Sequence, residues 1–92
     1  MSLETTVFTF KINVPFEEWA AVYDSEENIA MNKELGIICL YKGVKKDDPT
    51  SVMLIEQGEE GKSKAMFEDP AVKALIESAG HIYNSTVMSS YF

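Results

Sequence analysis

The chain has 92 residues, of which 46% are hydrophobic and 11% aromatic, so residues 1–92 are expected to fold as one small domain. Fifteen acidic residues against eight lysines, with no arginine, give a formal net charge of −7. This balance excludes nucleic acid and anionic membrane surfaces as expected partners, because the phosphates of both attract cations.

The start of the chain carries no basic and apolar leader, and no apolar run approaches ~18 residues, so a cytoplasmic protein is expected. Residues 1–4 are set aside as a tail outside the fold. Cys39 is the only cysteine, which excludes an internal disulfide. Because Cys39 lies within an apolar run, it is predicted to be a buried packing thiol.

The first predicted element is a strand over residues 7–14, where apolar and polar side chains alternate. Phe8, Phe10 and Ile12 then share one strongly apolar face. Pro15 ends the strand, because proline has no N–H with which to continue the pairing. The apolar face is expected to pack against the helices.

A helix is predicted to follow Pro15, because apolar side chains that include Trp19 and Tyr23 recur with helical spacing. Ser25 is a favourable N-cap residue. We therefore expect this helix to break near Ser25 and a second helical segment to run on until Gly36 ends it.

Two apolar runs, residues 37–42 and 51–57, predict strands that pair as a hairpin across a turn rich in Gly, Asp and Pro. Both strands are apolar on both faces for most of their length. A hairpin with one face in water would show polar alternation. Each face of this hairpin is therefore expected to be covered.

Gly61, Lys62 and Ser63 look like the end of a phosphate-binding loop. Such a loop needs a glycine five residues before its Gly-Lys-Ser, and here that residue is Glu56. Two further glutamates in the stretch would repel a phosphate. The stretch is therefore interpreted as the turn from the third strand into the next helix.

The remaining chain predicts a short helix to about Phe67, a second helix from Pro70 to Gly80, and a C-terminal strand over residues 81–92. Asp69 is a favourable N-cap, and proline is favourable in the first helical turn. The resulting order βαββαβ predicts an α+β, ferredoxin-like fold, with both helical regions on one face of a four-stranded antiparallel sheet.

Helices on one face of a sheet leave its other face open. Since both faces of the predicted hairpin are apolar, an apolar patch is left bare, which favours a homodimer through the open sheet face. The C-terminal residues 87–92 are expected to reach the partner. The sequence leaves open which sheet face carries Cys39 and Leu54.

The element order, the stretch SVMLIEQGEEGKSKAMFEDPAVKALIESAG and its break at Asp69-Pro70 resemble the dimeric α+β barrel superfamily. It includes antibiotic-biosynthesis monooxygenases, muconolactone isomerase and small families of unassigned function, to which this chain is most similar. The resemblance implies a barrel of two sheets across a twofold axis, with a cavity between the sheet and helices of each protomer. Glu56 matches a glutamate that often ends the third strand of oxygenase-like members. Their frequent histidine in the next helix corresponds here to Met66-Phe67, which argues against oxygenase chemistry.

The candidate site residues are few. His81, the only histidine, is either a general base or a hydrogen-bonded residue at the rim. Glu56 is either an acid with a perturbed pKa that faces the cavity, or a residue that caps a strand end or pairs with a lysine. One histidine without further ligands predicts no metal site, and no cofactor is expected. A pocket for a ligand is expected near Trp19, Tyr23, Phe67 and Tyr83.

Two functions remain open at this stage. The first is a homodimer that binds a small apolar molecule or a protein partner without catalysis. The second is a cofactor-independent enzyme, similar to a monooxygenase or an isomerase, that acts on a small aromatic or apolar substrate with His81, Glu56 or a tyrosine. The fold cannot decide between them, because one fold supports many functions.

Overall fold

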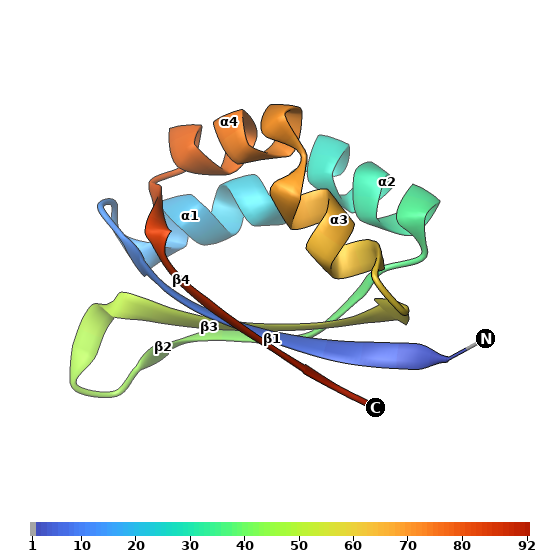
Figure 1. Ribbon diagram of the computed structural model, residues 1–92. Coiled ribbons are helices and arrows are strands. Elements are labelled where there is room, and N and C mark those ends of the chain that lie inside the picture. The colour runs from blue at the N-terminus through green and yellow to red at the C-terminus, as the bar shows by residue number, and fades with distance from the viewer. Residues whose placement is uncertain (1) are drawn as a thin grey trace.

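The computed structural model describes residues 2–92, which form a four-stranded antiparallel sheet with four helices on one face (Figure 1). The strands are β1 (Leu3–Ile12), β2 (Ile38–Lys45), β3 (Asp48–Glu59) and β4 (His81–Tyr91). The helices are α1 (Phe16–Tyr23), α2 (Glu26–Leu35), α3 (Lys62–Glu68) and α4 (Pro70–Ser78). The strand order β2-β3-β1-β4 confirms the predicted ferredoxin-like arrangement. Across residues 2–92, no helix has the length and apolar character needed to cross a membrane.

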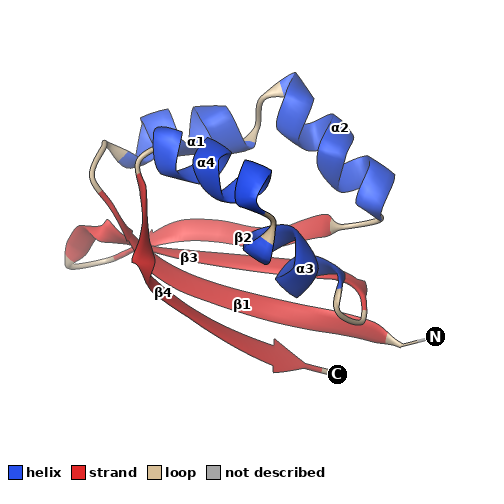
Figure 2. Ribbon diagram, turned by 45° about the horizontal axis from the view of Figure 1, so that its top comes forward, coloured by secondary structure: helices blue, strands red, loops and turns tan. Residues whose placement is uncertain are grey.

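Strand β1 forms the centre of the molecule and pairs with both β3 and β4. It begins at Leu3, so two of the residues that the sequence analysis set aside belong to the sheet. Phe8, Phe10 and Ile12 are each at most 3% exposed and pack with Trp19 and Ala79 in the core. The predicted contact between this face and the helices is therefore confirmed, and Figure 2 shows the two layers.

The two predicted helix breaks are confirmed, so that each helical region consists of two segments. The Ser25 hydroxyl accepts a hydrogen bond from the Asn28 N–H at 3.3 Å and caps α2. Gly36 ends α2 in the left-handed conformation, with φ at 72°. The Asp69 carboxylate accepts from the Ala71 N–H at 2.8 Å and caps α4.

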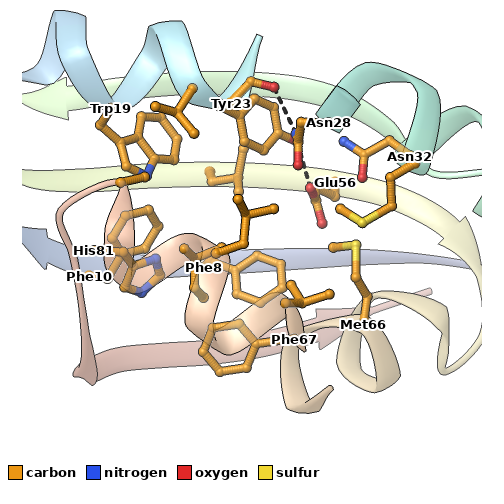
Figure 3. Close-up of a pocket in the computed structure, with 17 residues that line it drawn as sticks. Phe8, Phe10, Trp19, Tyr23, Asn28, Asn32, Glu56, Met66, Phe67 and His81 are labelled. Atoms are coloured by element: carbon orange, nitrogen blue, oxygen red, sulfur yellow. Dashed lines mark hydrogen bonds between the residues drawn. The ribbon is translucent and has the colours of Figure 1, made fainter. Parts of the chain in front are cut away.

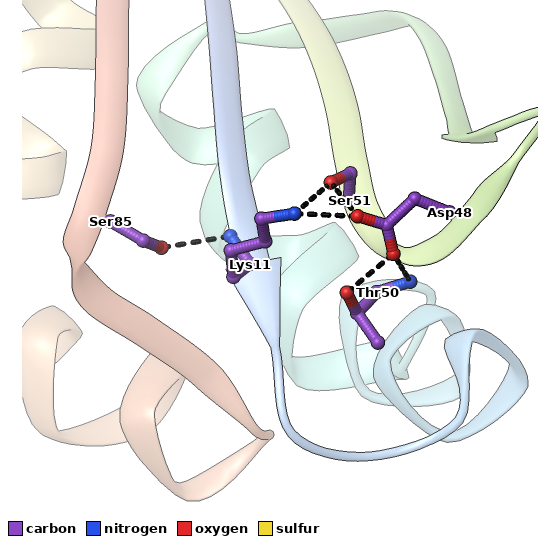
Figure 4. A network of polar contacts seen from close by, with 5 residues as sticks. All are labelled: Lys11, Asp48, Thr50, Ser51 and Ser85. Atoms are coloured by element: carbon purple, nitrogen blue, oxygen red, sulfur yellow. Dashed lines mark hydrogen bonds and ion pairs between the residues drawn. The ribbon is translucent and has the colours of Figure 1, made fainter.

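The turn between β2 and β3 is shorter than predicted, because β2 continues to Lys45 and β3 begins at Asp48. Side-chain contacts of Asp48 hold the strands together there (Figure 4). Its carboxylate accepts from the Lys11 ammonium at 2.6 Å, and from the N–H and hydroxyl of Thr50. These contacts, led by Lys11, hold the pKa of Asp48 far below its usual value.

Strand β4 pairs with β1 in two parts, with an irregularity between them. Lys11 lies opposite Ile82, whereas Thr9 lies opposite Val87. In the gap, the Lys11 N–H donates to the Ser85 hydroxyl at 2.8 Å, so a side chain replaces the missing ladder bond (Figure 4). The C-terminal part of β4, which was expected to reach a partner, thus pairs with β1 of its own chain as far as Tyr91.

A bulge in β2 decides which side chains face the helices. Cys39 lies opposite Glu56, and Tyr41, two residues later, lies opposite the adjacent Ile55. Because Glu56 is buried under the helices, Cys39 lies on the helix side and Tyr41 on the open side. Leu54 is also buried on the helix side. The sequence left open which sheet face carries Cys39 and Leu54, and both lie on the helix side.

The prediction that Cys39 is buried is wrong, because its side chain is exposed. The reason is that β2 is an edge strand, with only β3 beside it. The register places seven large, exposed side chains on the open face of the sheet. They are Leu3, Ile38, Tyr41, Met53, Ile82, Val87 and Tyr91, which are between 40% and 64% exposed.

Asp69→Ala is expected to lower the free energy of unfolding by about 0.5–2 kcal/mol, because it removes the N-cap of α4. Asp69→Asn keeps a side-chain acceptor and should stay within a few tenths of a kcal/mol of the wild type. Urea unfolding followed by circular dichroism measures both variants. Equal stability of the two variants would contradict the role of the cap.

Candidate functional site

A cavity of about 60 Å³ lies between the sheet and the helices (Figure 3). Most of its wall is apolar and comes from β1, β3 and all four helices. This apolar wall consists of Phe8, Phe10, Trp19, Val22, Tyr23, Met31, Leu54, Met66, Phe67, Val72, Leu75, Ile76 and Ala79. Four polar side chains complete it, namely Asn28, Asn32, Glu56 and His81.

Aromatic rings in contact build the sheet side and the α1 side of the cavity. The ring centroids of Phe10 and Trp19 are 5.5 Å apart, and Trp19 stacks on Tyr23 at 5.4 Å. Phe8 and Phe67 are likewise 5.5 Å apart. Such ring pairs stabilise each other beyond simple burial, so they strengthen the packing of this part of the wall.

Glu56 is the most unusual residue of the wall, because its carboxyl lies in an apolar layer and is only 1% exposed. The Tyr23 hydroxyl donates to Oε2 of Glu56 at 2.5 Å, and the Ser63 hydroxyl donates to Oε1 at 3.4 Å. Burial raises the pKa of Glu56, although these two hydrogen bonds oppose the shift. Burial and the neighbouring carboxyl raise the pKa of Tyr23 as well. The pair therefore holds its protons more strongly than either group does in water.

Local structure explains why Tyr23 and Ser63 meet Glu56. Tyr23 is the last residue of α1, and the Asn28 side chain donates to its carbonyl at 2.7 Å across the break before α2. Ser63 lies in the first turn of α3, just after Gly61, which has a φ of 85°. The stretch that looked like a phosphate loop thus supplies a partner for the carboxyl.

His81 lies at the start of β4 and is buried, with 6% exposure, and is therefore not at the rim. Its ring stacks on Phe10 at 3.8 Å, and its Nε2 atom is 2.7 Å from the Thr86 hydroxyl. Burial lowers the pKa of His81 to about 4, so the ring is neutral at pH 7. Figure 3 shows His81 beside Phe10, whereas Glu56 lies beside Asn28.

The structure brings most of the predicted site residues to one cavity. Trp19, Tyr23 and Phe67 line it together with Glu56 and His81. Tyr83 does not line the cavity. Its ring stacks on Phe67 at 4.6 Å, and its hydroxyl donates to the Phe67 carbonyl at 2.8 Å.

Sequence reasoning missed Asn28, Asn32 and Ser63. The two asparagines are four residues apart on α2, so they share one helix face. This spacing is the signal from which a polar edge of the cavity could have been predicted. Ser63 gave no such signal, because its partner Glu56 lies on another element. Among residues 2–92, no three His, Cys, Asp or Glu side chains lie close enough together to hold a metal ion.

Chemically, the arrangement places one carboxyl and one phenol at the polar end of an apolar cavity. A buried carboxyl with a raised pKa is a candidate for exchanging a proton with a bound molecule. The cavity is thus suited to hold an apolar molecule and to contact one polar group on it.

A family model described as a domain of unknown function (DUF3764) matches residues 3–92, and the chain belongs to this family. A comparison with curated protein sequences found no match.

Several solved structures share the fold. SnoaB, a cofactor-independent oxygenase from Streptomyces nogalater, has a TM-score of 0.69 at 12% identity, covering 100% of this chain and 93% of that chain. A NIPSNAP family protein from Agrobacterium tumefaciens has a TM-score of 0.64 at 15% identity, with coverage of 99% and 92%. A dimeric protein of unknown function with a ferredoxin-like fold, from Bacteroides fragilis, has a TM-score of 0.54 at 17% identity, with coverage of 97% and 94%. These likenesses confirm the fold and the predicted resemblance.

Glu56→Gln is expected to gain stability relative to the wild type as the pH rises. The pKa of Glu56 is raised above 4.5 in the folded state, so above pH 4.5 the unfolded chain releases its proton first. The free energy of unfolding of the wild type should therefore fall, by up to about 1.4 kcal/mol per pH unit, until the folded pKa is passed. Urea unfolding of both proteins between pH 4 and 8 measures this difference. A difference that does not change with pH would contradict the shift.

Proposed function

We propose that this member of the DUF3764 family is a homodimer, in which each protomer binds a small apolar molecule in the cavity between sheet and helices. One observation carries the proposal: an apolar, largely aromatic cavity has three of its four polar side chains, Asn28, Asn32 and Glu56, together at one end (Figure 3). Small-molecule sites commonly combine an apolar wall with a few polar groups that orient the ligand.

The size of the cavity limits the ligand. Drug-sized ligands occupy pockets of about 300–1,000 Å³, whereas this cavity measures about 60 Å³. Met31 and Met66 lie in its wall and are the side chains most able to move, because methionine is unbranched and adapts its shape. The ligand is therefore a small molecule that displaces these two side chains as it enters.

The open face of the sheet supports the dimer. It carries seven exposed large side chains, and burying each one stabilises an assembly by roughly 1.5–3 kcal/mol. Association costs on the order of 4–15 kcal/mol, which several such side chains on each protomer can offset. The face also has a hollow of about 510 Å³, lined by Tyr41, Met53 and Lys11 among others, that a side chain of the partner can fill.

A second candidate function is an enzyme that moves a proton on the bound molecule. The observation that favours it is the buried Glu56 carboxyl, with its raised pKa and its short hydrogen bond to Tyr23. A carboxyl with a pKa near the working pH is an effective general acid or base. The two candidates differ in one respect: Glu56→Gln should abolish turnover in an enzyme and leave affinity nearly unchanged in a binding protein.

Ligand binding is tested with protein labelled with ¹³C at the methionine methyl groups. Titration with toluene and aniline should shift the signals of Met31 and Met66, which line the cavity, and leave Met53 on the open face unchanged. Val72→Phe adds a ring at the wall and should weaken binding at least tenfold. Signals that stay in place with both molecules would reject the proposed cavity function.

Light scattering is expected to give about twice the chain mass of 10.3 kDa at micromolar concentration. Met53→Asp places a charge in the middle of the open face and should give a monomer, because an unpaired charge is costly to bury. Ile29→Asp is the matched control, since Ile29 is 54% exposed on α2, which lies in the helical layer. A wild-type protein that stays monomeric would reject the dimer.

A further inference from the structure

Asn32 has a buried polar atom without a partner. The residue lies on α2 and is 8% exposed, and its Oδ1 atom makes no hydrogen bond within residues 2–92. Figure 3 shows its amide directed toward the part of the cavity that contains Glu56 and Asn28. Because nearly all buried polar atoms in proteins are paired, an unpaired one in a cavity wall requires an explanation.

Glu56 is also only partly satisfied. Its Oε2 atom accepts the short hydrogen bond from Tyr23, but Oε1 has only the Ser63 hydroxyl, at 3.4 Å. Hydroxyl donors normally approach to about 2.7–2.8 Å, so this contact leaves Oε1 free to accept a better donor. The unfilled positions at this end of the cavity, Oδ1 and Oε1, are therefore both oxygen acceptors.

We propose that this end of the cavity recognises a hydrogen-bond donor, so that the ligand is a small apolar body carrying an amino or hydroxyl group. The inference rests on the proposed binding function and adds the chemical class of the ligand. The donor group satisfies Oδ1 of Asn32 and lies near Glu56, while the apolar body contacts the aromatic rings.

The same geometry rejects other ligands. A molecule without a polar group leaves Oδ1 of Asn32 unpaired in a dry cavity. A molecule whose polar group only accepts hydrogen bonds places the lone pair of an oxygen or nitrogen against the acceptor atoms Oδ1 of Asn32 and Oε1 of Glu56. A site built for a donor discriminates strongly against analogues that lack it, because its own polar groups then stay unpaired.

Four probes of similar size test this inference by titration of ¹³C-methyl-methionine protein, with Met66 as the reporter. Aniline and phenol carry a donor, benzonitrile only accepts, and toluene has no polar group. Aniline and phenol are expected to bind at least tenfold more tightly than benzonitrile and toluene. Equal affinities, or tighter binding of benzonitrile, would overturn the donor site and leave the cavity function intact. No shift with any probe would overturn both.

Asn32→Leu removes the acceptor but keeps the branched shape of the side chain, and it should reduce the preference for aniline over toluene to less than twofold. The same variant should melt at a higher temperature than the wild type, because an unpaired buried oxygen is lost. An asparagine that only supports the fold would instead lower the melting temperature when replaced. Met31→Leu, a change in the apolar wall on the same helix, should keep the preference. An Asn32→Leu variant that retains the full preference for aniline would refute the inference. The ranking of the four probes in the wild type tests the same inference without any variant.

Discussion

The hydrogen bond between Tyr23 and Glu56 is the contact on which the site depends. It joins the last residue of α1 to the C-terminal half of β3, inside an otherwise apolar layer. A carboxyl in such a layer is costly unless it is paired, and the phenol supplies that pairing. Tyr23 ends α1, so the helix break and the hydrogen bond from the Asn28 side chain to the Tyr23 carbonyl lie directly beside this contact.

A domain of this size has little stability to spare, since small chains bury a smaller share of their surface. The buried carboxyl, the unpaired oxygen of Asn32 and the unpaired hydroxyl of Thr6, which lies opposite Glu56 on β1, all reduce that stability. Apolar residues at these positions would give a more stable core. Polar groups that lower stability are expected where a protein contacts a ligand, and two of these three, Glu56 and Asn32, line one end of one cavity.

Comparison with known structures places the chain among proteins of different activities on one scaffold. The fold is shared with an oxygenase and with NIPSNAP proteins, yet the side chains decide the chemistry. Met66 and Phe67, for which the resemblance to oxygenase-like members implied a histidine, both line the cavity. The polar chemistry of this chain is concentrated instead in Glu56 and its neighbours, so function has to be argued from that end of the cavity.

The sequence by itself determined the parts of the structure that depend on neighbours in the chain. The buried face of β1 follows from alternation, and the breaks at Ser25 and Asp69 follow from capping within three residues. Only the tertiary structure decided that Cys39 is exposed, because exposure depends on strand order and β2 lies at the edge. It also decided that Asn32 and Glu56 share one cavity. Such contacts join distant parts of the chain, and neither periodicity nor capping carries information about which distant residues meet.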